Sequence, residues 1–394
     1  MKNWLWIAIA AAIGIPAVAL RLGGTELEPG CAAFVFGAAI AGAAFILAWA
    51  AEAAQKHISQ ALALAFLALI AVLPEYAVDI YFAWTAGVNP QYASYAAANM
   101  TGSNRLLIGI GWPMIALLFW LRKKQKAVVV EKGQGTALSF LVLATIYSFT
   151  IPLKGSLSLV DSGILITLFA LYIWSSSRMK REEPELTGPP AAIASLPRTA
   201  SVLVTVFLFL LPAGIIFASA EPFAEGLIAA GKNAGIDEFI LVQWVAPLAS
   251  EAPEMIVAAI FALRGNAVAA LVVLISAKIN QWSLLIGTLP VAYCISAGSA
   301  GALPLDSRQA GEVMLTAAQS AFAIVLLARL RLTVPAAIIL LVLFATQLGF
   351  IAPEVRWGYA ILYVLLAFVI LSIDRERRLG LWDMMRATYA TFKR

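Results

Sequence analysis

Two glutamates follow prolines inside apolar stretches of this sequence. They are Glu75, after Pro74, and Glu254, after Pro253. A carboxylate inside an apolar segment is costly, so it needs a functional or structural reason. A proline removes one helical N–H donor, which frees a nearby carbonyl oxygen. Hard cations such as Ca²⁺ prefer carboxylate and carbonyl oxygens as ligands. Each Pro-Glu pair therefore predicts a helix break that offers both kinds of ligand to a cation.

Polar residues follow each Pro-Glu pair at nearly the same spacing. Residues 99–104 (Asn-Met-Thr-Gly-Ser-Asn) precede a Leu-Leu-Ile-Gly run at 106–109, and residues 276–281 (Ser-Ala-Lys-Ile-Asn-Gln) precede the same run at 284–287. The second copy is one residue shorter between Pro-Glu and this run. The chain therefore contains an internal repeat built around the two glutamates.

The composition indicates that helices crossing a membrane must position these residues. The 394 residues are 62% hydrophobic and 12% charged, and the mean hydropathy is +0.89. A soluble domain is about 45–50% apolar and about 25% charged. The apolar runs have the length of helices, not of barrel strands. Net charge +5 does not indicate nucleic-acid binding, because the basic residues cluster between the apolar runs. The sequence has two cysteines (Cys31, Cys294) and one histidine (His57). These are too few for a disulfide framework, and they argue against a zinc site built from His and Cys.

We expect an all-α polytopic membrane protein with about twelve spans. The spans are predicted at about 4–20, 31–50, 61–85, 92–121, 136–153, 157–174, 201–220, 239–263, 267–296, 313–330, 333–350 and 357–373. They form an extra helix (1–29), repeat 1 (30–175), a linker (176–199), repeat 2 (200–350), and a last helix with a basic tail (351–394). The linker is polar and rich in proline and charge, so no core is expected there.

The distribution of Lys and Arg orients these spans. The basic loops follow spans four, six and ten and the chain's last span, which places them on one side if both termini are cytoplasmic. Span three then runs outward and span eight inward, so the two five-helix repeats have inverted topology. Transporters use this arrangement to build a site near the membrane midplane. We expect an integral protein of the inner or plasma membrane.

Pro-Glu in one helix and Gly-Ser-Asn in the next, in two inverted copies, resembles the α-repeats of the calcium/cation antiporter superfamily, which includes sodium/calcium exchangers. The first copy is the better match, because the second has Asn-Gln-Trp where the first has Gly-Ser-Asn. The resemblance implies that Glu75 and Glu254 are the central metal ligands. The resemblance also implies further cation ligands, or residues that support them, on the neighbouring helices and before the second Pro-Glu. These are Ser103, Gln281, Asn99, Asn104, Ser250 and Asn280.

Some positions depart from the sodium-coupled members of that superfamily. Where these carry hydroxyl residues before Pro-Glu, the first copy has Ala71 and Val72, and the second has Ser250 and then Glu251. The polar residue that follows Gly-Ser-Asn in that superfamily is replaced by Leu107 in the first copy and by Leu285 in the second. Lys278 lies one turn before Gln281, where its ammonium could pair with Glu251 or Glu254 or occupy the place of a coupling sodium ion. These departures weaken the expectation of sodium coupling and favour protons.

Structural explanations stay open for several of these residues. Both Pro-Glu carboxylates could bind a neighbouring helix, and Asp79, one turn after Glu75, either supports the site or lies near the outer surface with Arg105 as a partner. Glu251 and Lys278 could form a purely structural pair. The polar side chains of the motif helices could simply pack helices together, as membrane interfaces favour.

We therefore expect a secondary active cation antiporter that works by alternating access. Ca²⁺ is the cargo that the resemblance implies, and H⁺ or Na⁺ the counter-ion. The alternative is a Na⁺/H⁺ or other monovalent cation antiporter on the same fold. An intramembrane enzyme would need a nucleophile or metal constellation that the sequence lacks, and a channel would need a repeated pore-lining ring. The expected partners are inorganic cations and lipid, without nucleic acid or a resident cofactor, and the oligomeric state stays open.

Overall fold

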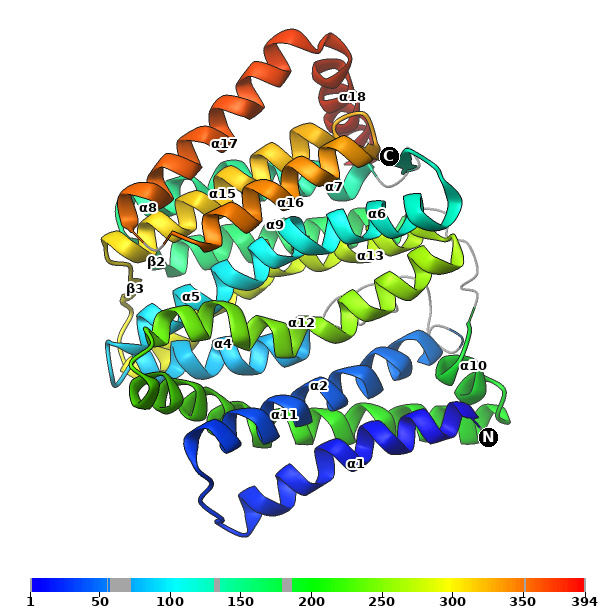
Figure 1. Ribbon diagram of the computed structural model, residues 1–394, viewed down its shortest axis with the longest axis vertical. Coiled ribbons are helices and arrows are strands. Elements are labelled where there is room, and N and C mark those ends of the chain that lie inside the picture. The colour runs from blue at the N-terminus through cyan, green and yellow to red at the C-terminus, as the bar shows by residue number, and fades with distance from the viewer. Residues whose placement is uncertain are drawn as a thin grey trace. The chain divides into compact units, whose positions relative to one another are not determined.

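The structure is a computed structural model that describes residues 2–54, 56, 72–130, 135–178, 186–350 and 352–392 (Figure 1). It is dominated by helices. Seventeen α-helices are described: α1 (Lys2–Leu22), α2 (Pro29–Ala54), α4 (Leu73–Ala86), α5 (Tyr92–Leu106), α6 (Trp112–Lys123), α7 (Gly135–Ser148), α8 (Thr150–Lys154), α9 (Leu159–Ser177), α10 (Pro189–Ala194), α11 (Arg198–Ala234), α12 (Glu238–Arg264), α13 (Ala267–Asn280), α14 (Ile286–Ala297), α15 (Ser307–Leu327), α16 (Val334–Leu348), α17 (Pro353–Ile373) and α18 (Arg375–Phe392). Two π-helical turns, η1 (Leu107–Gly111) and η3 (Gln281–Leu285), join α5 to α6 and α13 to α14.

The predicted membrane spans are largely confirmed. Among the described residues, ten helical stretches are long and apolar enough to cross a membrane, and α16 is a shorter apolar helix. The third predicted span begins outside the described residues, and only its end, α4, is seen. Span seven, predicted at about 201–220, is part of a longer helix, α11, that continues to Ala234. The fold is that of an all-α polytopic membrane protein.

The chain divides into two compact units that each contain segments from both expected repeats. Unit 1 comprises Met1–Phe82 and Ser177–Glu254, and unit 2 comprises Ala83–Ser176 and Met255–Arg394. The first boundary falls inside α4 and the second inside α12, directly after Glu254. Compactness therefore does not follow the order of the repeats along the sequence.

In unit 1, α1, α2 and α11 pack side by side (Figure 1). Glycines allow the close approach: a Cβ on Gly37 would lie 2.8 Å from the Phe223 ring, and one on Gly42 would lie 2.9 Å from the Ala10 carbonyl oxygen. The linker, expected to be without a core, contains the short helix α10. Its Ile193 is fully buried in a cluster with residues of α1, α2 and α11. That part of the expectation is wrong, because a single apolar turn is enough to cover one end of this cluster.

Two short strand pairs in unit 2 join the two halves of the sequence. Strand β1 (Ala127–Val129) pairs antiparallel with β4 (Arg331–Thr333), and β2 (Ser156–Ser158) pairs antiparallel with β3 (Ala302–Pro304). β1 and β3 follow the fourth and ninth spans, while β2 and β4 separate spans five from six and ten from eleven. Each pair thus joins the strand that follows the motif-bearing span of one repeat to the strand that lies between the last two spans of the other repeat. Helices α7 and α8 separate β1 from β2, and α15 separates β3 from β4, so the pairs lie at opposite ends of these helices. This pattern agrees with the predicted inverted repeats.

Candidate functional site

The predicted carboxylates of unit 1 lie on α4 and α12. Glu75 is in the first turn of α4 and is 1% exposed, and Asp79, one turn later, is fully buried. On α12, Glu251 is 3% exposed. The Glu254 Oε2 atom is buried and accepts no hydrogen bond from the described residues. Burying this many acidic groups within helices is costly unless they are hydrogen-bonded, paired with positive groups, or bind cations or protons.

Helix α12 is not interrupted at Pro253, contrary to the predicted break. It runs as one helix from Glu238 to Arg264, with Pro247 and Pro253 inside it. A proline still has no N–H to donate to the carbonyl four residues earlier. The Ala249 oxygen therefore lacks its usual helical donor, one turn before Glu254. The ligand types expected at this position are retained without a break in the helix.

Ser250, on the turn before Glu254, keeps acceptor capacity. Its hydroxyl lies 3.4 Å from the Ala246 carbonyl and 3.3 Å from the Pro247 carbonyl, to which it donates. A hydroxyl oxygen has two lone pairs in addition to its hydrogen. Because the hydrogen is directed back along the helix, the lone pairs of Ser250 remain for a cation.

In unit 2, the polar motif of α5 is buried and locally ordered. Asn99 is 1% exposed, and Ser103 and Asn104 are fully buried. The Ser103 hydroxyl donates to the Asn99 carbonyl at 3.1 Å, and the Asn104 amide nitrogen donates to the Met100 carbonyl at 2.7 Å. The second bond fixes the Asn104 carboxamide, so that its oxygen points away from its own helix.

That oxygen binds Lys278 of α13. The Lys278 ammonium lies 2.7 Å from Asn104 Oδ1 and 3.3 Å from the Asn104 carbonyl oxygen. It also lies 4.2 Å from the centre of the Trp282 ring, a cation–π contact. Lys278 is fully buried. The structure therefore places a side chain cation among motif residues of both repeats, where oxygen atoms and an aromatic face surround it.

Two further predicted residues, the last of α13 and the first of η3, lie close to this lysine in the sequence. Asn280 and Gln281 are both fully buried, and Gln281 is the first residue of η3. In the first repeat, η1 begins at Leu107, three residues after Asn104. Single π-helical turns inside α-helices are frequent at functional sites. A π-turn thus follows the polar motif in both repeats, which the sequence analysis did not predict.

A buried ion-pair cluster, also missed from the sequence, holds the residue after Asn104. Arg105 Nη2 lies 2.6 Å from Glu312 Oε2, and Arg356 Nε lies 3.3 Å from Glu312 Oε1. The Gln319 amide donates to the Arg105 carbonyl at 3.4 Å. These contacts join α5 to α15 and α17. Arg105, suggested as a partner of Asp79, thus has Glu312 as its described ion-pair partner. The available signal was Arg105, a basic residue inside the predicted span 92–121; Glu312 lies just before the predicted span 313–330, although α15 includes it.

The predicted site residues are divided between the units. Unit 1 holds Glu75, Asp79, Ser250, Glu251 and Glu254, and unit 2 holds Asn99, Ser103, Asn104, Lys278, Asn280 and Gln281. Within unit 2 the structure brings Asn104 and Lys278 together. The approach of Glu75 to Ser103 and of Glu254 to Gln281 stays a prediction, as does pairing of Lys278 with a carboxylate. Across the described ranges, no three His, Cys, Asp or Glu side chains gather in a group that could hold a metal. His57 lies outside those ranges.

Comparison with known proteins gives the relatives of the chain. Residues 30–178 and 204–352 each match the profile of the family described as sodium/calcium exchanger protein. The crystal structure of an H⁺/Ca²⁺ exchanger, CAX, is 42% identical, with a TM-score of 0.96, over 100% of this chain and 99% of that one. The comparison with curated proteins found no match.

A more distant likeness concerns the fold alone. A structure of the sodium-calcium exchanger NCX_Mj, soaked with Na⁺ and Sr²⁺, is 18% identical, with a TM-score of 0.55, over 84% of this chain and 98% of that one. The two matched segments correspond to the two repeats expected from the Pro-Glu pairs and together cover well over half of the chain. The chain therefore belongs to the sodium/calcium exchanger protein family.

Proposed function

We propose that this protein is a secondary active antiporter that moves Ca²⁺ across a membrane in exchange for H⁺. The observation that carries this proposal is the matched pair of buried Pro-Glu carboxylates, Glu75 and Glu254, in the two repeats of a cation exchanger family. The 42% identity to an H⁺/Ca²⁺ exchanger supports the choice of both ions. The membrane is the inner or plasma membrane, and both termini are cytoplasmic, as the basic loops favour.

Competition for the carboxylates gives the exchange. Glu75 and Glu254, when ionised, supply the negative charge that Ca²⁺ requires, and the Ala249 carbonyl and Ser250 hydroxyl supply neutral oxygens. Protonated carboxyl groups no longer attract the divalent ion. Ca²⁺ and protons therefore occupy the site in turn, and alternating access carries each in its own direction. Ser103 and Gln281, which hold matching positions in the two sequence repeats, are the next predicted ligands.

Lys278 supports protons as the counter-ion. Its buried ammonium occupies part of the polar motif region of α5 and α13, where sodium ions would need oxygen ligands. Ala71 and Val72 stand where sodium-coupled relatives carry hydroxyl residues, and Leu107 and Leu285 stand where they carry a polar residue. The same lysine favours the second candidate function, a monovalent cation/proton antiporter, because an internal positive charge reduces the net negative charge available to a divalent ion.

The proposal includes no enzymatic activity and no resident cofactor. The family consists of exchangers, and the inorganic cation is cargo. Glu75 and Glu254 act as ligands and not as general acid and base.

Flux measurements test the proposal. The full chain is reconstituted in liposomes loaded with radioactive calcium, and a proton or a sodium gradient is imposed. We expect calcium to move against its gradient when protons drive it. Glu75→Gln and Glu254→Gln should each abolish this flux, while the matched control Glu354→Gln, an exposed residue at the start of α17, should retain it. Exchange of sodium for protons without calcium movement would favour the second candidate, and calcium flux that survives both mutations would refute the site.

A further inference from the structure

The last helix, α18, is fixed to unit 2 by one face. Met384 and Thr388 are buried. The Thr388 hydroxyl lies 3.0 Å from the Ser139 hydroxyl of α7, and Met384 lies against Gly135, where a Cβ would be 3.2 Å from its Cγ. Phe392 stacks against Trp174 at the end of α9, with ring centres 5.2 Å apart. One side of α18 therefore covers the ends of α7 and α9.

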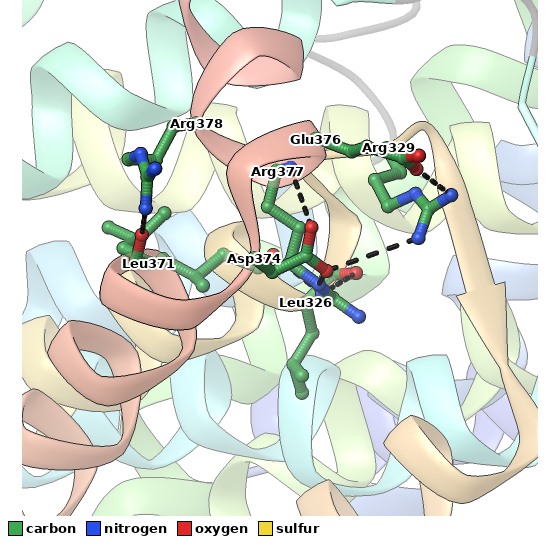
Figure 2. Close-up of polar contacts among 8 residues, drawn as sticks. Leu326, Arg329, Leu371, Asp374, Glu376, Arg377 and Arg378 are labelled. Carbon is green, nitrogen blue, oxygen red and sulfur yellow. Dashed lines mark hydrogen bonds and ion pairs between the residues drawn. The ribbon is translucent and has the colours of Figure 1, made fainter.

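Polar contacts fix the start of α18 as well. Figure 2 shows the turn between α17 and α18, where Arg377 binds Asp374 at 3.0 Å and the Leu326 carbonyl at 2.8 Å. Arg329 pairs with Glu376. The carboxylates of Asp374 and Glu376 are thus neutralised by Arg377 of the same turn and by Arg329, just beyond the end of α15. Rotation of α18 about its axis would break these bonds.

The opposite face of α18 is exposed and has a distinct composition. Arg375, Leu379, Trp382, Arg386 and Tyr389 follow one another at spacings of four, three, four and three residues, which places them in one stripe along a helix. All five are exposed, Trp382 by 66% and Tyr389 by 63%. We call these five residues the outer stripe.

The outer stripe carries positive charge without a protein counter-charge. Within the described part of the chain, Arg375 and Arg386 form no ion pair, while Glu376 is occupied by Arg329. Asp383 is the one other acidic residue of α18. Arginines beside a tryptophan and a tyrosine on one helix face are typical of helices that lie in the interfacial region of a bilayer, where the aromatic rings reach the acyl boundary and the guanidinium groups reach phosphates.

We propose that the outer stripe of α18 is a binding surface for the headgroups of anionic lipids. The chain already spans a membrane, so α18, attached to the ends of spanning helices, is near lipid headgroups. A second copy of this chain is a poorer partner, because the stripe of that copy would bring two more arginines and no acidic residue to pair with them. Free phosphate would use the guanidinium groups but leave Trp382 and Leu379 in water. Anionic lipid satisfies both the charges and the aromatic residues.

Quenching of Trp382 by brominated lipids tests this surface. The full chain is reconstituted in phosphatidylcholine vesicles that contain a minor fraction of either brominated phosphatidylglycerol or brominated phosphatidylcholine. Because the chain has 11 tryptophans, the Trp382 signal is taken as the difference between the parent protein and Trp382→Phe. We expect brominated phosphatidylglycerol to quench this signal more strongly, since each arginine near an anionic surface favours the anionic lipid about fivefold. High salt should weaken the preference.

A double variant and a matched control make the test specific. Arg375→Gln with Arg386→Gln should equalise the two lipids, each measured with and without Trp382→Phe. Arg122→Gln with Lys126→Gln, exposed basic residues in the last turn of α6 and just after it, should leave the preference intact. Equal quenching by both lipids in the parent, or absence of quenching, would overturn the proposal, as would a control pair that acts like the Arg375 and Arg386 pair. Inorganic phosphate is added in parallel with chloride at equal ionic strength. If phosphate removes the preference for brominated phosphatidylglycerol and chloride does not, the stripe is a phosphate site instead.

Discussion

The Lys278 ammonium lies 2.7 Å from the side-chain oxygen of Asn104, although 174 residues separate the two in the sequence. One belongs to the polar motif of the first repeat and the other to that of the second. The contact joins α5 to α13 and puts a fixed positive charge at the meeting of the two motifs. A charge in this position affects which additional cation the surrounding oxygens can hold.

We expect Lys278→Met to make calcium flux depend on sodium. The variant removes the ammonium but keeps an apolar side chain against Trp282, and it leaves the Asn104 oxygen unoccupied. A small monovalent ion can then bind where the ammonium was. The measurement is calcium flux in liposomes under a proton gradient, with either sodium or choline as the bulk cation. The flux of the parent should be the same in both salts, and the flux of Lys278→Met should differ between them.

The control for this prediction keeps the charge. Lys278→Arg retains a cation at the position, so its flux, even if slower, should remain independent of sodium. Sodium-independent flux in Lys278→Met would show that the lysine does not stand in for a coupling ion, and its role would then be restricted to holding α5 and α13 together.

The spanning helices could be predicted from their long apolar runs. Several site residues could be predicted because charged residues are rare inside such runs. Glu75, Glu254 and Lys278 stand out because a charge within a span is unusual, and the repeat of Pro-Glu relates the first two. Pair partners were harder to predict. Asn104 is one of several buried polar residues, and nothing local indicates that it, and not Ser103 or Asn99, binds Lys278. The partner is chosen by how two helices distant in the sequence pack.

Removing the Glu312 carboxylate should strongly destabilise the protein. Glu312 lies between Arg105 and Arg356, and both its ion pairs are buried. Glu312→Gln would remove the carboxylate that the two buried guanidinium groups share, and breaking a buried ion pair in this way costs about 3–5 kcal/mol. The thermal unfolding midpoint in detergent, followed by intrinsic fluorescence, measures the loss.

Arg356→Met is the matched comparison. It removes one arginine and leaves Arg105 paired with Glu312 at 2.6 Å, so the remaining charges are balanced. We expect less than half of the loss seen with Glu312→Gln. Equal losses from the two variants would contradict the charge argument and would attribute the effect to packing alone.

A glycine in η1 should tolerate substitution less well than its counterpart in the second repeat. A Cβ on Gly109 would lie 2.2 Å from Cγ of Phe344, at the rigid base of the ring, whereas a Cβ on Gly287 would lie 3.0 Å from Cγ1 of Ile166. We expect Gly109→Ala to cost about 1–3 kcal/mol or more from overpacking, and Gly287→Ala much less. Unfolding midpoints of the two variants check this. Phe344→Ala in the Gly109→Ala background should relieve the clash only in part, because it removes the ring but keeps the residue-344 Cβ at 2.7 Å, and it leaves a cavity.

Several elements were beyond sequence prediction for physical reasons. The four strands have three residues each, too few for an alternating pattern. A π-turn holds one residue more than an α-turn, and the neighbouring helices must leave room for it; at η1 the Phe344 side chain lies directly against Gly109. Helix α18 was expected only as a basic tail, because its inward face consists of scattered residues such as Met384 and Thr388. Its structure depends on Ser139 and Gly135, more than 240 residues earlier.

Acid should release α18 through Asp374. Desolvation acts to raise the pKa of Asp374, but hydrogen bonds from the Arg377 backbone and guanidinium, together with the charges of Arg377 and Arg329, outweigh it, so the pKa lies below its ordinary value. A carboxyl whose pKa is lowered by folding stabilises the folded form above the unfolded pKa of about 3.9, and this stabilisation is lost as the pH falls through the lower, folded value. Protonation would remove the acceptor that holds Arg377 beside the end of α15 (Figure 2).

Hydrogen exchange of the α18 amides measures this release. The protection of α18 relative to α17 should be constant above about pH 4 and should fall below it. Asp374→Asn should show reduced protection throughout and lose the acid dependence, because its amide carries no charge to titrate. Asp383→Asn, which removes a carboxylate elsewhere on α18, should keep the profile of the parent. If Asp374→Asn retains the same acid-dependent loss, another group releases the helix, and the contacts of the α17–α18 turn do not control its attachment.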